Sequence, residues 1–196
     1  CHLGNGCSMA AVEHGESVET SMGMTPLEGL VMGTRCGDVD AGALIHLLRQ
    51  DGWDVDKLDE FLNRDSGLAG LSGVGNDLRD IEARAADGDE RCQLAIDVFA
   101  HRARKYIGAY AATMGGVDAI VFTAGIGQNS ALMRREITSR LGFLGAQLDD
   151  AANRAVSLTD AEPVASFSAP NATCALLAVA TDEQHAIARD TARVIG

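Results

Sequence analysis

Residues 117–141 combine amino-acid types whose spacing suits the binding of a phosphorylated ligand. Residues 119–123 are a short run of β-branched and aromatic residues, which is typical of a buried strand. A turn of small residues follows at 124–127, and Asn129 or Ser130 can cap the helix after it. A strand, a glycine turn and a helix N-terminus together expose backbone N–H groups to a ligand. The same pattern also forms tight strand–helix connections that bind nothing.

A second candidate is the polar loop at residues 34–40, which reads Thr-Arg-Cys-Gly-Asp-Val-Asp. Its density of glycine and polar residues is unusual unless a ligand or a partner orders the segment, but taken alone the pattern favours a solvated surface loop. Of the 16 lysines and arginines in the chain, only Lys57 and Lys105 are lysines. An anionic ligand would therefore be met by arginine side chains, by backbone N–H groups or by a metal ion.

The elements that would position these segments alternate in type along the chain. Periodicity and turn residues predict strands at residues 7–12, 17–21, 119–123, 143–148, 163–168 and 173–179. They predict helices at 41–50, from 55 to near 67, at 77–86, at 90–114, after the turn at 124–127, after Asp149 and from Thr181 onward. Residues 13–16 are expected to be a turn, and 22–37 and 68–76 loops. Thr181 and Gln184 have the spacing of a capping box, which would place Glu183 in the first turn of the last helix.

This order of elements predicts an α/β fold with a mixed central sheet flanked by helices on both faces. Residues 40–114 are expected to form a mostly helical segment within it. Ligands of such sheets bind at the carboxyl ends of the strands. That rule places the segment after Cys1, the turn at Gly125 and the helix start at Glu183 on one side of the molecule.

Composition and charge limit the classes of function. The chain has 196 residues, 46% of them hydrophobic, and a net charge of −12, which argues against a nucleic-acid surface. No apolar stretch approaches the roughly 18 residues needed to cross a bilayer, so we expect no membrane partner. Five scattered cysteines without a Cys-x-x-Cys pair fit reduced thiols and a cytoplasmic location: Cys1, Cys7, Cys36, Cys92 and Cys174. The opening Cys-His-Leu-Gly-Asn-Gly lacks an initiator methionine, and we expect a fragment of a longer protein that begins near the end of a strand.

Six motifs recur in an order that resembles the acetokinase family, which comprises acetate kinase and its propionate and butyrate relatives. They are residues 2–6 (His-Leu-Gly-Asn-Gly), 23–30 (Gly-Met-Thr-Pro-Leu-Glu-Gly-Leu), 32–38 (Met-Gly-Thr-Arg-Cys-Gly-Asp), 76–80 (Asn-Asp-Leu-Arg-Asp), 122–129 (Phe-Thr-Ala-Gly-Ile-Gly-Gln-Asn) and 181–183 (Thr-Asp-Glu). The resemblance covers essentially the whole chain but only the C-terminal half of a family member. It implies the actin-like ATPase fold, of the ribonuclease H-like type, and the C-terminal nucleotide-binding lobe of that fold.

The resemblance also implies nucleotide contacts, with ATP or ADP as the substrate. The phosphate-binding turn would be formed by His2, Leu3, Gly4, Asn5 and Gly6. The adenosine end would be contacted by Asp77, Leu78, Arg79, Gly125, Ile126, Gly127, Gln128 and Asn129. Without the family, His2 would be interpreted as a satisfied core histidine and Asp77 as a residue that merely favours a helix dipole.

Two charged residues acquire roles in phosphoryl transfer by the same resemblance. Arg35 matches the arginine that stabilises the transition state, and a planar, permanently charged fork suits that task. The alternative for Arg35 is a surface ion pair with Asp38 or Asp40. Glu183 matches the family's ligand of Mg²⁺, an ion that binds through one or two carboxylates plus substrate phosphates. The alternative for Glu183 is an ordinary acidic residue in a first helical turn.

The implied activity is that of acetate kinase, the reversible transfer of the γ-phosphoryl group of ATP to acetate, which makes acetyl phosphate. The family's N-terminal lobe supplies the acetate pocket, a catalytic aspartate and a histidine, so this chain alone is expected to be inactive. Family members form homodimers through this half. The alternatives are a propionate or butyrate kinase lobe, or a non-catalytic module for nucleotide binding or dimerisation.

Overall fold

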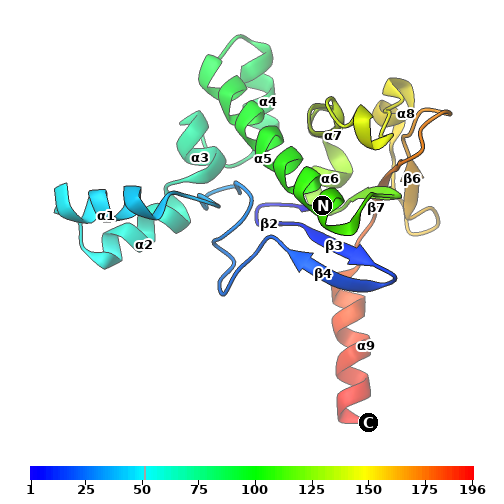
Figure 1. Ribbon diagram of the computed structural model, residues 1–196, viewed down its shortest axis with the longest axis horizontal. Helices are drawn as coiled ribbons and strands as arrows, with labels where there is room; N and C mark the ends of the chain where they lie inside the picture. The colour runs from blue at the N-terminus through cyan, green and yellow to red at the C-terminus, as the bar shows by residue number, and fades with distance from the viewer. Residues whose placement is uncertain (51) are drawn as a thin grey trace.

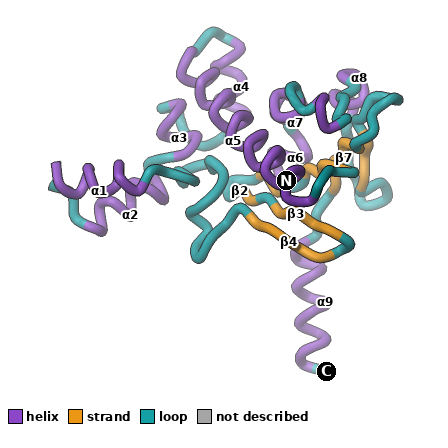
Figure 2. The backbone as a smooth tube through the Cα atoms, viewed as in Figure 1, coloured by secondary structure: helices purple, strands orange, loops and turns teal. Residues whose placement is uncertain are grey.

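Short strands pair at the centre of the molecule, and helices lie around them (Figure 1, Figure 2). The computed structural model describes residues 1–50 and 52–196. Its strands are β1 (His2–Leu3), β2 (Cys7–Ser8), β3 (Ala10–Glu13), β4 (Glu16–Thr20), β5 (Ala119–Phe122), β6 (Val164–Ser166) and β7 (Ala175–Val179). Its helices are α1 (Ala41–Gln50), α2 (Val55–Arg64), α3 (Gly67–Ser72), α4 (Leu78–Ala86), α5 (Glu90–Met114), α6 (Ala124–Asn129), α7 (Ala131–Thr138), α8 (Asp150–Ala155) and α9 (Glu183–Ile195), with a 3₁₀ turn at Gly142–Leu144.

The strands form a mixed arrangement, as predicted. Strand β1 pairs antiparallel with β2, β3 forms a hairpin with β4, and β7 lies between its parallel neighbour β5 and its antiparallel neighbour β6. A bridge between His2 and Thr123 joins β1 to the end of β5, through hydrogen bonds from the Leu3 N–H to the Thr123 carbonyl (3.0 Å) and from the Thr123 N–H to the Cys1 carbonyl (2.9 Å). The carboxyl ends of β1, β5 and β7 therefore lie at one edge of the sheet.

The long helix α5 contributes more buried residues to the core than any other described element. Its bounds are those predicted, because Asp89 caps its N-terminus and Gly115, with φ of 74°, ends it. Phe99, Ile96 and Ala103 are almost fully buried on its inner face, and α5 packs against α3, α4 and α7. The apolar side chains that recur along α5 at spacings of three and four residues are therefore part of the core.

Three local predictions were wrong. Residues 68–76 were expected to be a loop, but α3 begins at Gly67, whose φ of 62° and tight fit against the Met32 carbonyl suit a glycine that opens a helix. A strand was expected at 143–148, but the chain there has a 3₁₀ turn followed by single bridges at Ala146 and Leu148. The last helix is capped by Asp182, whose carboxylate accepts from the His185 N–H at 2.9 Å, in place of the expected Thr181.

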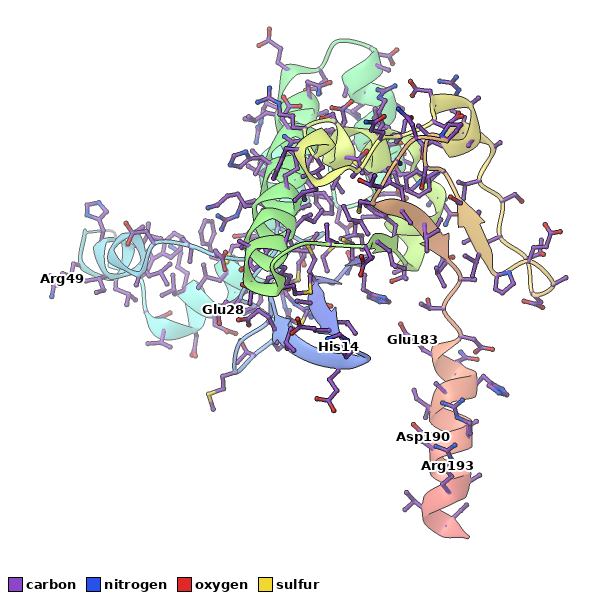
Figure 3. All side chains as sticks on the ribbon, turned by 45° about the vertical axis from the view of Figure 1, so that its right-hand side comes forward. His14, Glu28, Arg49, Glu183, Asp190 and Arg193 are labelled. Atoms are coloured by element: carbon purple, nitrogen blue, oxygen red, sulfur yellow. The ribbon has the colours of Figure 1, made fainter. Side chains whose placement is uncertain are left out.

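Helix α9 projects away from the rest of the molecule (Figure 1). Glu183 lies at its inner end, and Asp190 and Arg193 lie farther out (Figure 3). Its larger apolar side chains are exposed: Ile187 by 66%, Val194 by 85% and Ile195 by 80%. Across residues 1–50 and 52–196, no helix combines the length and the apolar character that a bilayer crossing requires.

Candidate functional site

The three strand ends bring His2, Thr123 and Glu183 together. His2 Nδ1 lies 2.9 Å from the Thr123 hydroxyl, and His2 Nε2 lies 3.3 Å from the Glu183 carboxylate. The His2 side chain is 40% exposed and that of Glu183 67% exposed. His2 is therefore a residue of the open sheet edge, and the alternative of a satisfied core histidine does not describe it. The single imidazole links the start of β1, the end of β5 and the start of α9.

The segment after β1 forms a compact turn beside this edge. The Gly4 N–H donates to the Gly6 carbonyl at 3.1 Å, and the Asn5 carbonyl accepts from the Gly33 N–H at 2.8 Å. A Cβ atom on Gly33 would collide with the Asn5 side chain. Asn5 and Gly6 are nevertheless exposed. The turn is thus fixed against the loop that carries Arg35, while its own backbone stays accessible to a ligand.

The guanidinium of Arg35 lies close to this turn, and its positive charge is not paired with any described acidic residue. It donates weakly to the Pro26 carbonyl at 3.3 Å, and a Cβ atom on Gly6 would lie 3.5 Å from its Nη1. Among the described residues, no carboxylate lies within 4.0 Å of it. The alternative of an Arg35–Asp38 ion pair is absent from this structure. An arginine without an acidic partner among the described residues suits a transient anion.

Asp38 instead fastens the Arg35 loop to α5. Its carboxylate accepts from the Tyr106 hydroxyl at 2.8 Å and lies 3.2 Å from Arg102 Nη2, and it also accepts from the Gly29 N–H at 2.9 Å. Burial and the bond to Asp38 raise the pKa of Tyr106. These contacts fix Gly29 and Asp38, which lie before and after Arg35 in the sequence, relative to each other and to α5.

A pair of tyrosines one helical turn apart tests this attachment. Tyr106→Phe is expected to lower the free energy of unfolding by about 1 kcal/mol, because it removes the hydroxyl donor to Asp38 Oδ2 and leaves Arg102 Nη2 as the partner of that oxygen. Tyr110→Phe is the matched control, since the Tyr110 hydroxyl is buried and has no hydrogen-bond partner among the described residues. Its replacement should be neutral or slightly stabilising in urea denaturation. Equal losses in the two variants would contradict the assignment.

The other predicted nucleotide residues surround a cavity of about 620 Å³. It is lined by Gly4, Asn5, Asn76, Asp77, Leu78, Arg79, Glu82, Gly125, Ile126, Asn129 and Ser130. The cavity therefore brings together the turn after β1, the start of α4 and the start of α6, which are far apart in the sequence. Gly127 and Gln128 are not among its lining residues, and Gly127 is buried behind it.

Asp77 has a structural role in addition to its place in the cavity. Its carboxylate caps α4 by accepting from the Arg79 N–H at 2.9 Å. The Arg79 side chain also donates to it, from Nε at 3.0 Å and from Nη2 at 2.6 Å. These hydrogen bonds lower the pKa of Asp77 to about 2. The two residues thus largely neutralise each other at the mouth of the cavity.

The glycine segment after β5 is helical, and its description as a turn was wrong. Ala124 takes φ of 61°, an unusual value for a residue with a side chain, and absorbs the sharp change from strand to helix. Helix α6 then runs directly through the two glycines to Asn129, and Ser130 caps α7 by accepting from the Met133 N–H at 2.9 Å. The bare backbone of Gly125 consequently faces the cavity from the first turn of a helix.

Arg134 is a supporting residue that the sequence did not reveal. Its side chain is 2% exposed and donates to the Gly127 and Gln128 carbonyls, at 3.0 and 2.6 Å. It also donates to the side chain and the backbone carbonyl of Asn153, both at 2.8 Å. One guanidinium thus ties the end of α6 to α8. The sequence carried one signal for this role, because Arg134 lies between Met133 and Ile137 on the apolar side of α7.

Glu183 is the one residue that the sequence indicated for a metal ion. Within the described part of the chain, no group of three or more histidine, cysteine, aspartate or glutamate side chains is placed to hold a metal. A single exposed carboxylate beside a glycine turn still fits Mg²⁺, which keeps several waters and takes further oxygens from substrate phosphates. The donors present thus fit a metal that arrives with a nucleotide.

A mixed sheet with its site at the strand ends defines this molecule as an α/β protein of the actin-like ATPase class, because its solved neighbours have that fold. The family model described as "Acetokinase family" matches residues 1–189, and the chain belongs to this family. It is 52% identical over 195 residues to an acetate kinase of Heliobacterium modesticaldum, a match that covers 100% of this chain and 48% of the relative. An acetate kinase of Clavibacter michiganensis is 52% identical over 190 residues, covering 97% of this chain and 47% of that protein.

Solved structures give the same result. The acetate kinase of Porphyromonas gingivalis superimposes with a TM-score of 0.92 at 41% identity, covering 100% of this chain and 48% of the other. A propionate kinase of Francisella tularensis gives a TM-score of 0.85 at 42% identity, covering 93% and 45%. The chain thus spans about half the length of the relatives it matches.

Proposed function

We propose that this chain is the nucleotide-binding half of an acetate kinase, which transfers the γ-phosphoryl group of ATP to acetate and works reversibly in the cytoplasm. The observation that carries the proposal is the cavity in which residues 4–5, residues 76–79 and three residues of α6 (Gly125, Ile126 and Asn129) meet, next to the turn that Arg35 approaches at Gly6. The names of the relatives support acetate as the acceptor. The 42% identity to a propionate kinase supports that substrate as the second candidate.

The chain's own residues would act mainly by positioning and by charge. Backbone N–H groups of Asn5 and Gly6 would hold the nucleotide phosphates, since the Gly4 N–H donates to the Gly6 carbonyl, and Gly125 and Ile126 would receive the nucleoside. Arg35 would neutralise charge that develops on the equatorial oxygens of the transferring phosphoryl group. Glu183, oriented by His2, would hold Mg²⁺, which when bound neutralises phosphate charge. Exclusion of water from the site strengthens each of these interactions.

Two surfaces support a further lobe that completes the site. A cavity of about 720 Å³ lies between β3, the end of α5 and the free edge of β5. Its lining includes the Cys1 amino group, which donates to the Val121 carbonyl at 2.7 Å. The exposed apolar side chains of α9 provide a second contact area. The acetate pocket and the remaining catalytic groups would belong to that lobe, and the whole enzyme would form a homodimer.

The experiment compares this chain with a protein that contains both halves. ATP, Mg²⁺ and one carboxylate (acetate, propionate or butyrate) are supplied, and the acyl phosphate is trapped with hydroxylamine. The two-lobe protein is expected to prefer acetate, and the 196-residue chain alone is expected to give no product. A preference for propionate would select the second candidate. A two-lobe protein that is inactive on all three carboxylates would refute the kinase proposal.

A further inference from the structure

Glu82 is an acidic residue in the nucleotide cavity to which neither the sequence motifs nor the mechanism gives a role. It lies on α4 one turn after Leu78, and both residues line the cavity. Its Oε1 accepts from the Ser130 hydroxyl at 2.5 Å, and Ser130 is itself held at the N-terminus of α7. The carboxylate is thus fixed across the junction between α4 and α7.

The surroundings of Glu82 leave its charge without a cation. Among the described residues, no basic nitrogen lies within 4.0 Å of this carboxylate. The nearby Arg79 is engaged by Asp77, with 2.6 Å between Nη2 and Oδ2. Partial burial raises the pKa of Glu82, and its hydrogen bond from Ser130 acts in the opposite direction. A carboxylate can only accept hydrogen bonds, and among the described residues Ser130 donates to Oε1 but nothing donates to Oε2.

The charge and the position of Glu82 indicate which part of a nucleotide could donate a hydrogen bond to it. The negative charge of Glu82 would repel the phosphates of a nucleotide. The turn at residues 4–6, beside Arg35, would bind those phosphates instead. Asn76 lies between the two regions, since its Nδ2 donates to Asn5 Oδ1 at 2.7 Å. The nucleoside, in contrast, has neutral donors in its ribose hydroxyls and in the amino group of adenine.

We propose that Glu82 determines nucleoside specificity by accepting a hydrogen bond from a neutral donor of the nucleoside, a ribose hydroxyl or the adenine amino group. This inference rests on the proposed function, because it assumes that the cavity binds a nucleotide. Ser130 acts as a positioning residue, because its hydroxyl fixes the carboxylate toward the cavity.

The test is calorimetric titration of the full 196-residue chain with four ligands in the presence of Mg²⁺. The ligands are ADP, 2′-deoxy-ADP, 3′-deoxy-ADP and inosine diphosphate, which lacks the amino group. The variants are Glu82→Gln, which keeps the shape of the side chain, and Glu82→Leu, which removes both oxygens. Asp80→Asn is the matched control, since Asp80 is exposed on the same helix and outside the cavity.

The unaltered chain and Asp80→Asn are expected to bind one of the three analogues about tenfold more weakly than ADP, and that analogue identifies the donor. Glu82→Leu should bind ADP about tenfold more weakly and should no longer distinguish that analogue from ADP, and Glu82→Gln should shift in the same direction. If both Glu82 variants bind all four ligands as the unaltered chain does, or lose affinity for all four equally, the inference is overturned while the nucleotide site stands. If the unaltered chain binds no ADP at all, the proposed function fails and this inference fails with it.

Discussion

Arg35→Ala is expected to lower kcat of the complete two-lobe enzyme by about a thousandfold or more, with little change in the free energy of unfolding. The catalytic loss follows from removing the charge that would stabilise the transferring phosphoryl group. The unchanged stability follows from the contacts, because within the described part of the chain the guanidinium makes one weak hydrogen bond, to the Pro26 carbonyl, and a 3.7 Å contact with the sulfur of Met32.

The measurement is steady-state kinetics paired with urea denaturation of the same variants. Arg35→Lys should recover only part of the rate, because an ammonium group lacks the planar fork. Arg154→Ala is the control, since Arg154 is exposed and lies 4.0 Å from Asp150, its one acidic partner among the described residues. A variant Arg35→Ala that keeps more than a tenth of the rate would show that Arg35 does not contact the reacting group.

Arg134→Met is expected to lower the free energy of unfolding by about 3 kcal/mol and to weaken ADP binding as well. The substitution keeps much of the buried volume but leaves the carbonyls of Gly127, Gln128 and Asn153 without their charged donor. It also removes the guanidinium from the face of Phe167, whose ring centre lies 5.3 Å away. Loss of the desolvation cost of the charge offsets part of this effect.

The neighbouring Arg135 provides the control, because its side chain is 48% exposed and its polar contacts within the described residues are with Glu136. Arg135→Ala should change stability by less than about 0.5 kcal/mol. Urea midpoints of the two variants make the comparison. If Arg134→Met were as stable as Arg135→Ala, the guanidinium would not anchor α6, and its effect on the site would need another explanation.

The elements predicted well are those whose signals are local. Helix α5 carries a long apolar stripe between an aspartate cap and two glycines, and its bounds were predicted to the residue. The hairpin of β3 and β4 follows from His14 and Gly15, which take φ of 53° and 87° as its two-residue turn requires. Residues 143–148 have an apolar pattern that suits a strand, but Gly145 takes φ of 80° against Thr173, which breaks the strand. Such a contact between distant segments has no local signature.

The candidate site likewise contains residues that local motifs predict and residues whose roles depend on contacts between distant segments. Motifs at residues 2–6, 77–79 and 125–129 were sufficient to predict three of the segments that meet, and the strand-end rule placed His2 and Glu183 on one edge. Two further residues depend on tertiary contacts with partners far along the chain. Glu82 meets Ser130 across 48 residues, and Arg134 meets Asn153 across 19. Charged residues on predicted helices are usually solvated, so neither could be selected from its own neighbourhood.

The most direct test of the nucleotide-binding account is calorimetric titration of the chain with ADP, with and without Mg²⁺, beside the Glu183→Ala variant. The account predicts one site per chain, tighter binding with Mg²⁺ in the unaltered protein, and no such enhancement in Glu183→Ala. Absence of ADP binding, or an equal effect of Mg²⁺ in both proteins, would contradict it.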